Sequence, residues 1–132
     1  MNNPKQICLH KLAGHRKEGF HFIIFKDGTI LEALKIVAVP INSIGHNKDV
    51  IAIALEGDFI FEEVTLEQLN SSKVLLLKLC TAYNIDTTMH HIFTHCDYRD
   101  PPGDRSCPGK YLHRAVPGIA KEVYQAIKRG VK

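Results

Sequence analysis

The chain has 132 residues, enough for one compact domain with its own core, and we expect a single domain over residues 1–132. Hydrophobic residues make up 45% and charged residues 23%, which excludes a disordered or low-complexity chain. The formal net charge of +3 is too small to indicate nucleic-acid binding, and no apolar run approaches the roughly 20 residues that a membrane span needs.

The charges are unevenly distributed along the chain. Between Asp49 and Ser72 there are six acidic residues and no Lys or Arg, whereas between Lys110 and Lys132 six basic residues stand against one acid, Glu122. A basic C-terminal segment is either a solvated helix face or a surface that helps the protein to approach an anionic polymer such as a cell wall.

The first half of the chain is predicted to form strands. Aromatic and β-branched residues predict strands over Gln6–Leu12 and Phe20–Phe25. Asp27-Gly28 is typical of a tight hairpin turn, so we expect a returning strand over Ile30–Val39. The continuous apolar run Val50–Leu55 is typical of a central strand that is covered on both faces.

The second half is predicted to be mainly helical. Thr65 and Gln68 match a capping box, and apolar residues nearly all round the following segment predict a well-buried helix up to Tyr83. His91–Thr94 is expected to be a short strand, and Pro117 is expected to open a final amphipathic helix. The order of these elements predicts an α/β fold in which a mixed central sheet is flanked by helices.

The segment between these last two elements has no predicted helix or strand. Long loops inside compact domains usually carry function, and this one holds His95, Cys96 and Cys107 among charged residues. Zinc favours imidazole nitrogen and thiolate sulfur, and a catalytic zinc site uses three protein ligands and one open position. The residues alone therefore offer His95 and Cys107 as two zinc ligands.

A third zinc ligand would have to come from another part of the chain. The candidates in the N-terminal region are His10, His15 and His21, of which His10 ends the first predicted strand. The two remaining cysteines, Cys8 and Cys80, lie in apolar runs and are expected in the core.

Two motifs of this sequence occur together in a known family. His95-Cys96-Asp97 followed by Cys107-Pro108-Gly109 resembles an H-x-D…C-P-G signature, and Gly19–Ile24 with Asp27-Gly28 resembles a G-Y-H-F-x-I-x-x-D-G hairpin. Both belong to the type 2 N-acetylmuramoyl-L-alanine amidases, a family that includes bacteriophage lysozyme-like amidases and peptidoglycan recognition proteins.

Three further segments resemble the same family in the same order. Ile7–His10 resembles an apolar strand that ends in the first zinc histidine, and Asn47–Gly57 resembles an N-x-x-S-I-G-I-x-L-x-G strand. Thr65–Leu69 resembles the T-x-x-Q start of the helix that follows. The resemblance spans roughly residues 7–113 and implies the amidase fold.

The resemblance also implies a zinc site and an activity. It assigns His10, His95 and Cys107 as ligands of Zn2+ and places Arg105 near the scissile carbonyl. Zinc makes water reactive at neutral pH by lowering its pKa to about 7. Arg105, which stays charged, would stabilise the developing oxyanion. The implied reaction is zinc-dependent hydrolysis of the amide bond between N-acetylmuramic acid and L-alanine in peptidoglycan or a muropeptide.

The sequence departs from the family pattern at several positions. Phe20 stands where the hairpin has a tyrosine, Ala54 where some members have a glutamate general base, and Asn42-Ser43 where a His-Ala pair is usual. The spacing between His10 and the hairpin is also shorter than in the family, which keeps His15 open as the first ligand.

These departures leave the general base and two other functions open. The acids available as a base are Asp97, Asp104 and Glu32. One alternative is a catalytically inactive peptidoglycan-binding module of the same fold. The residues Phe20 and Ala54 support this alternative. Another is a cysteine-dependent hydrolase that uses Cys107 and needs no metal.

The N-terminal residues bear on where the protein acts. Met1-Asn2-Asn3-Pro4 shows no basic region followed by an apolar segment, so we expect no signal peptide. We expect cytoplasmic synthesis, followed either by release to the cell wall through phage-type lysis or by action on cytoplasmic wall fragments, with no nucleic-acid or membrane partner.

Overall fold

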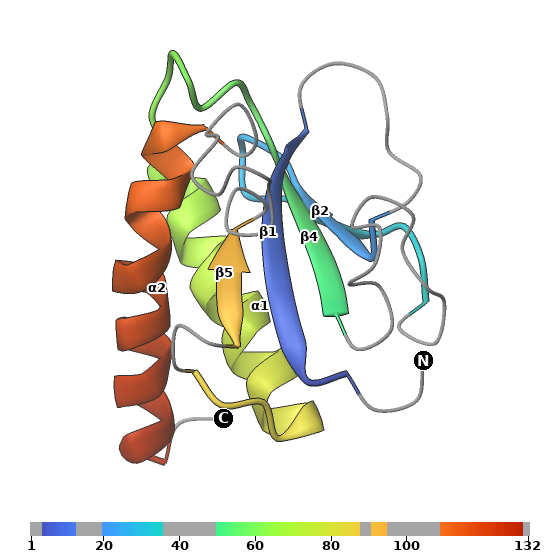
Figure 1. Cartoon of the computed structure of the whole chain (residues 1–132), viewed down its shortest axis with the longest axis vertical. Helices are drawn as coiled ribbons and strands as arrows, with labels where there is room; N and C mark the ends of the chain where they lie inside the picture. The colour runs from blue at the N-terminus through green and yellow to red at the C-terminus, as the bar shows by residue number, and fades with distance from the viewer. Residues whose placement is uncertain (1–3, 13–19, 36–49, 88–90, 95–108, 131–132) are drawn as a thin grey trace, which may run out of the picture.

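The computed structural model describes residues 4–12, 20–35, 50–87, 91–94 and 109–130. Figure 1 shows how the strands and helices of this part of the chain are arranged. In chain order they are β1 (Gln6–Leu12), β2 (Phe22–Ile24), β3 (Ile30–Glu32), β4 (Val50–Glu56), α1 (Leu66–Tyr83), β5 (Ile92–Thr94) and α2 (Lys110–Lys128).

The strands form one mixed sheet in the order β3-β2-β4-β1-β5. β1 lies parallel to β4 on one side and to β5 on the other, β2 is parallel to β4, and the hairpin partner β3 is antiparallel to β2. The predicted mixed α/β sheet is therefore confirmed. Because β1, β4 and β5 run in the same direction, their carboxyl ends meet at one edge of the sheet, where sites are commonly built.

Both described helices pack against the same face of the sheet (Figure 1). Side chains alternate between the two faces of a strand, so every second residue of β1 and β4 meets the helices. This main core joins Ile7, Leu9, Ile51, Ile53 and Leu55 to buried residues of both helices. Neither helix is long and apolar enough to cross a membrane.

The opposite face of the sheet carries smaller clusters. One consists of Leu12, Phe20, Ile23, Ala52 and Ala54, and another of Cys8, Val50 and Phe93. Every residue of β4 from Val50 to Leu55 is buried, as the prediction of a doubly covered strand required.

β3 is shorter than the expected returning strand. The prediction ran from Ile30 to Val39, but the strand ends at Glu32, and residues 36–39 lie outside the described residues. β3 is an edge strand whose three residues are all exposed, and its partner β2 offers three residues for pairing. A strand with no buried face gains little stability from pairing over more residues.

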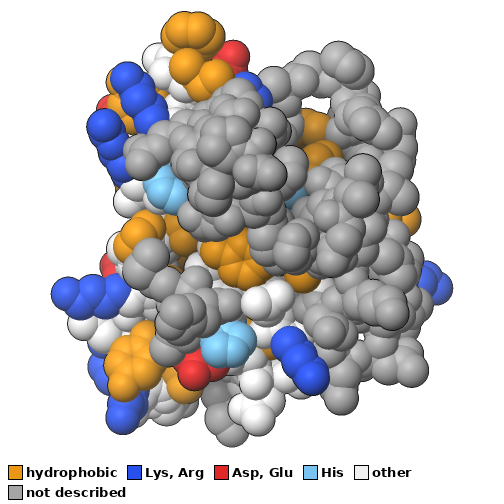
Figure 2. Space-filling model, in the orientation of Figure 1, with side chains coloured by type: hydrophobic (Ala, Val, Ile, Leu, Met, Phe, Trp, Pro, Cys, Tyr) orange, Lys and Arg blue, Asp and Glu red, His pale blue; other side chains and the backbone are white. Residues whose placement is uncertain are grey.

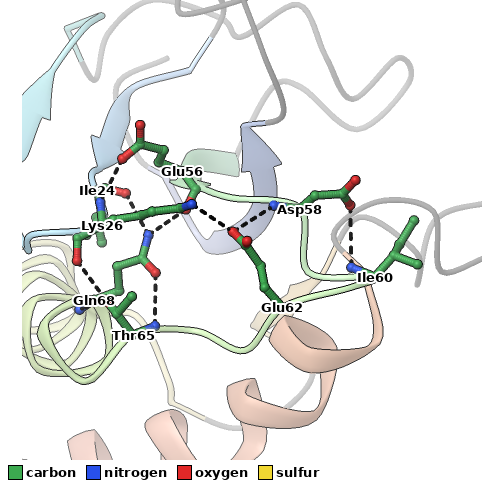
Figure 3. A network of polar contacts seen from close by, with 8 residues as sticks. All are labelled: Ile24, Lys26, Glu56, Asp58, Ile60, Glu62, Thr65 and Gln68. Carbon is green, nitrogen blue, oxygen red and sulfur yellow. Dashed lines mark hydrogen bonds and ion pairs between the residues drawn. The ribbon is translucent and has the colours of Figure 1, made fainter.

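α1 begins as its sequence predicts. The side chain of Thr65 accepts from the amide of Gln68 at 3.0 Å, and Gln68 Oε1 accepts from the amide of Thr65 at 3.1 Å. Gln68 is fully buried, and its Nε2 donates to the carbonyl oxygens of Ile24 at 3.3 Å and Glu56 at 2.8 Å (Figure 3). One amide thus ties the start of the helix to β2 and β4. The helix buries one face only, since Leu66 and Val74 are exposed.

The start predicted for α2 was wrong. The helix begins at Lys110, and Pro117 lies inside it instead of opening it. An interior proline costs a helix about 3 kcal/mol because it removes an amide donor and crowds the preceding turn. Here Leu112 and Val116 are buried against the core on the N-terminal side of the proline, and the exposed Pro117 faces away from the core. Burial of these side chains in the core therefore stabilises a helix that continues past Pro117.

Candidate functional site

His10 lies near the carboxyl end of the central strand β1. It pairs with Ala54 of β4, and its neighbour Leu9 pairs with Thr94, the last residue of β5. Alternation along β1 puts the imidazole on the face away from the helices, with Cys8 and Leu12. His10 is 1% exposed. The sheet thus holds this ring at the edge where three parallel strands end.

An aromatic ring fixes one side of the imidazole. The rings of His10 and Phe20 have centroids 5.2 Å apart and are tilted by 58°. Phe20 is 7% exposed and belongs to the apolar cluster on this face. Phe20 therefore positions the imidazole by packing, but it brings no hydroxyl group to the site.

His21 cannot serve as the third zinc ligand in its observed setting. Its Nδ1 accepts a hydrogen bond from the amide of Ala52 at 3.0 Å, and its backbone amide donates to the carbonyl of the same residue at 2.9 Å. A neutral imidazole whose Nδ1 accepts carries its proton on Nε2, so no lone pair is left for a metal. The fully buried His21 instead joins the hairpin to β4.

The end of β5 is tied to the first turn of α2. Thr94 Oγ1 lies 2.7 Å from Nδ1 of His113, and Thr94 is buried while His113 is half-buried. Because Thr94 directly precedes His95 in the sequence, this contact anchors the residue next to a predicted zinc ligand. No spacing in the sequence predicts this contact, since α2 was expected to start after His113.

Two described acids near the ends of strands, Glu32 and Glu56, bear on the search for a general base. Glu32 pairs with Phe22 and stands three strands from β1, or about 14 Å at ordinary strand spacing. Directly paired residues point to the same face of a sheet, and Phe22 packs with the main core, so Glu32 points away from the His10 face. Glu56 shares the face of Ala54, but its carboxylate accepts from the amide of Lys26 at 2.9 Å (Figure 3). Glu32 is therefore no candidate for the general base.

The remaining predicted site residues lie outside the described residues: His15, Asp97, Asp104, Arg105, His95 and Cys107. Within the described ranges, no group of three or more His, Cys, Asp and Glu side chains could hold a metal ion. His10 itself fits the donor chemistry that zinc prefers, because it presents an imidazole on the sheet face that carries the apolar cluster with Phe20 and Ala54.

The chain enters α2 through a close backbone contact. Gly109 has φ of +96°, and a Cβ atom added to it would lie 2.4 Å from the carbonyl carbon of Phe59. The amide of Tyr111 donates to the carbonyl of Phe59 at 3.0 Å, and Phe59 is 1% exposed. Gly109 is the glycine of the C-P-G motif, so the motif needs glycine both for its backbone angle and for this contact.

The turn that receives Gly109 is itself held by charged side chains. Lys11 of β1 pairs with Asp58 at 3.2 Å, and Lys26 pairs with Glu62 at 3.0 Å. The carboxylate of Glu62 also accepts from the amide of Asp58 (Figure 3). β1, the hairpin and α2 therefore all meet the segment after β4.

A groove of about 390 Å³ lies at the other end of the sheet and is distinct from the His10 region. It is lined by residues that include Lys5, Asp86 and His91. His91 precedes β5, and its carbonyl accepts from the amide of Ile7 at 2.7 Å. His91 therefore lies at the opposite end of β5 from Thr94.

The two buried thiols are core residues, as predicted. Cys8 packs with Val50 and Phe93, and Cys80 belongs to the main core. Burial, with a smaller effect of the nearby Asp86 carboxylate, raises the pKa of Cys80 to about 12. Neither thiol is suited to nucleophilic catalysis.

The fold is that of a small α/β domain with a mixed sheet and two described helices on one face. His10 lies near the carboxyl end of its central strand. A family model described as N-acetylmuramoyl-L-alanine amidase matches residues 1–110. The chain belongs to this family, and the resemblance found in the sequence motifs is confirmed.

Solved structures give the same result. The N-acetylmuramoyl-L-alanine amidase LysC from Clostridium intestinale URNW matches with a TM-score of 0.73 and 29% identity over 98% of this chain and 87% of its own. A human peptidoglycan recognition protein, PGRP-IBETAC, in complex with glycosamyl muramyl pentapeptide, matches with a TM-score of 0.72, 15% identity, and coverage of 88% and 83%. The second likeness concerns the fold alone. No curated protein sequence matches the chain.

Proposed function

We propose that the protein is a zinc-dependent N-acetylmuramoyl-L-alanine amidase that hydrolyses the bond between N-acetylmuramic acid and L-alanine in peptidoglycan. The observation that carries the proposal is the extent of the family match, which covers residues 1–110 and so includes His10, His95, Arg105 and Cys107. The 29% identity to LysC over nearly the whole chain supports it.

In this proposal His10, His95 and Cys107 hold Zn2+, whose chemistry is to activate water at neutral pH. His10 is the ligand with a described environment: the sheet fixes its backbone and Phe20 restricts its ring. A ligand that is already oriented loses little rotamer entropy on binding the metal. Arg105 remains charged and stabilises negative charge on the carbonyl oxygen during the reaction.

The proposed substrate is peptidoglycan or a muropeptide derived from it. Solved relatives with this fold were obtained with such fragments, namely tracheal cytotoxin on PGRP-LCa and PGRP-LCx and a muramyl pentapeptide on the human protein. We also propose that the protein reaches the wall by phage-type lysis, in line with the endolysins among its structural neighbours.

A second candidate function is recognition of peptidoglycan without cleavage. The observation that favours it is the apolar lining beside His10, where Phe20 and Ala54 replace a tyrosine and a glutamate of the family pattern. Such a protein would keep the fold and the metal but lack the groups that assist proton transfer.

The deciding experiment incubates the zinc-loaded protein with purified peptidoglycan and searches by mass spectrometry for stem peptides with a free N-terminal alanine. Release that stops when a chelator is added supports the amidase. Intact peptidoglycan that nevertheless retains the protein on sedimentation would contradict the amidase and favour the binding module. His95→Ala should lose stoichiometric zinc, and His91→Ala, at the far end of β5, should keep it.

A further inference from the structure

Four basic residues follow a single line along α2. Lys110, Arg114, Lys121 and Lys128 succeed one another at spacings of four, seven and seven residues. With about 3.6 residues per turn, these spacings correspond to about one, two and two turns. All four side chains are exposed. We call this set the basic line.

The basic line faces away from the core. The buried residues of α2 occupy the other side of the helix: Leu112, Val116, Ile119, Ala120 and Val123. In Figure 1 α2 lies at the edge of the molecule, and in Figure 2 Lys and Arg side chains appear along that same edge. At a rise of about 1.5 Å per residue the basic line is about 27 Å long.

No carboxylate neutralises this line from within α2. Glu122 is the one acid between Lys110 and Lys128, and it forms an ion pair with Lys73 of α1 at 2.6 Å. The ammonium group of Lys128 instead lies over the ring of Tyr124, 5.7 Å from its centroid. Tyr124 is 47% exposed. Among the described residues no ion pair holds these four positive charges, and an aromatic ring lies among them.

We propose that the basic line binds a linear polyanion of the cell wall whose backbone consists of phosphodiester-linked alditols. A row of like charges slightly destabilises a helix, and a polymer with regularly spaced phosphates would remove this repulsion along the whole row. The choice of a wall polymer rests on the proposed function, whereas the affinity for a linear polyanion rests on α2 alone.

A membrane surface suits this helix less well than a polymer. Helices that lie on membranes bury an apolar face among the lipids. The apolar face of α2 is already packed against α1 and the sheet, with Leu112 fully buried and Val123 1% exposed. Only Tyr124 and Ile127 remain exposed among the large apolar side chains of α2, so the charged row is better matched to a flexible polymer that can follow it.

The test measures binding of the full-length protein to purified poly(glycerol phosphate) by titration calorimetry at low and high salt. The double variant Arg114→Glu/Lys121→Glu should lower the affinity by about tenfold or more. The control variant Lys5→Glu/Lys78→Glu changes the net charge equally at exposed positions outside α2, and it should bind nearly as well as the wild type. Thermal unfolding checks that both variants are folded.

Three outcomes would overturn the proposal: no binding by the wild-type protein, an equal loss in both double variants, or stronger binding to vesicles of anionic lipid than to the polymer. Peptide release from peptidoglycan stripped of phosphate polymers should be the same in the wild type and in Arg114→Glu/Lys121→Glu. Absence of release from the wild type would contradict the proposed amidase function and leave the polymer result standing.

Discussion

Gln68 is the side chain through which α1, β2 and β4 share hydrogen bonds. It donates to Ile24 and Glu56 and accepts from Thr65, and it is fully buried. The helix cap could be read from the sequence because Thr65 and Gln68 are local. The two carbonyl partners could not, since they belong to strands whose place in the sheet is set by long-range pairing.

Gln68→Ala should lower the free energy of unfolding by about 2 kcal/mol or more, because one buried and two part-buried backbone groups lose a hydrogen-bond partner. Gln125→Ala removes the same amide from the exposed face of α2 and should change stability by less than about 0.5 kcal/mol. Urea unfolding of both variants provides the measurement. Equal values for the two would contradict the bridging role of Gln68.

Cys80 should resist alkylation in the folded protein. Burial raises its pKa to about 12 from a usual 9.0, so at pH 8 the thiol remains protonated. Peptide mapping after iodoacetamide treatment should find Cys80 unmodified in buffer and modified in urea. The stability that the neutral thiol contributes is fully present below pH 9.0 and is lost as the pH rises toward about 12. Equal modification with and without urea would contradict this assignment.

The candidate site was only partly predictable at this scale. His10 was identified because an apolar strand ends near it, and the structure places it on β1 beside the end of β5. The exclusion of His21 and Glu32 was not predictable. It depends on a hydrogen bond to Ala52 and on the position of β3 at the far edge of the sheet, and neither is encoded in local spacing.

At the scale of elements, α2 shows how tertiary contacts override a local signal. Pro117 is a strong start signal, yet the helix begins at Lys110 because the preceding turns bury Leu112 and Val116. Strands β1 and β4 and helix α1 were predicted within a residue of their bounds, since each has a long apolar run or a complete cap. The edge strand β3 had no such signal.

Gly109→Ala should disturb the start of α2 and the zinc affinity together. The added methyl group would meet the backbone of Phe59 at 2.4 Å, and the φ of +96° is unfavourable for alanine, so we expect a loss of about 2 kcal/mol or more in stability. Cys107 is two residues away in the sequence. Zinc affinity, measured by competition with a chromophoric chelator, should therefore fall.

Substitutions of two other glycines distinguish the two causes of the expected loss at Gly109, which are backbone strain and the contact with Phe59. Gly130 has φ of +80° but open space around it, so Gly130→Ala reports the backbone strain alone. Gly118 lies in α2 with open space, and Gly118→Ala should be neutral or stabilise by up to about 1 kcal/mol. If Gly130→Ala weakened zinc binding as much as Gly109→Ala, the contact with Phe59 would not be the cause.

At the scale of the whole molecule, the proposed ligands come from distant parts of the chain, so metal binding should stabilise the entire fold. A ligand at one hundred times its Kd adds about 2.7 kcal/mol to the native state. For a domain of this size that corresponds to a rise in Tm of about 10 °C.

Differential scanning fluorimetry with and without zinc measures this effect. The wild type and His91→Ala should show the rise in Tm, whereas His95→Ala should show none. A similar rise in His95→Ala would contradict the ligand assignment, because the stabilising zinc would then be bound elsewhere.

The position of β1 in the centre of the sheet has a consequence for how the protein is made. Both of its neighbours are synthesised later: Gln6 pairs with Val50, and Ile7 pairs with Ile92. As the nascent chain leaves the ribosome, the apolar residues of β1 have no partner until β4 emerges, and one side of the strand stays open until β5 follows. Such non-local parallel pairings form slowly. During translation β1 therefore stays incompletely paired until β5 has been synthesised.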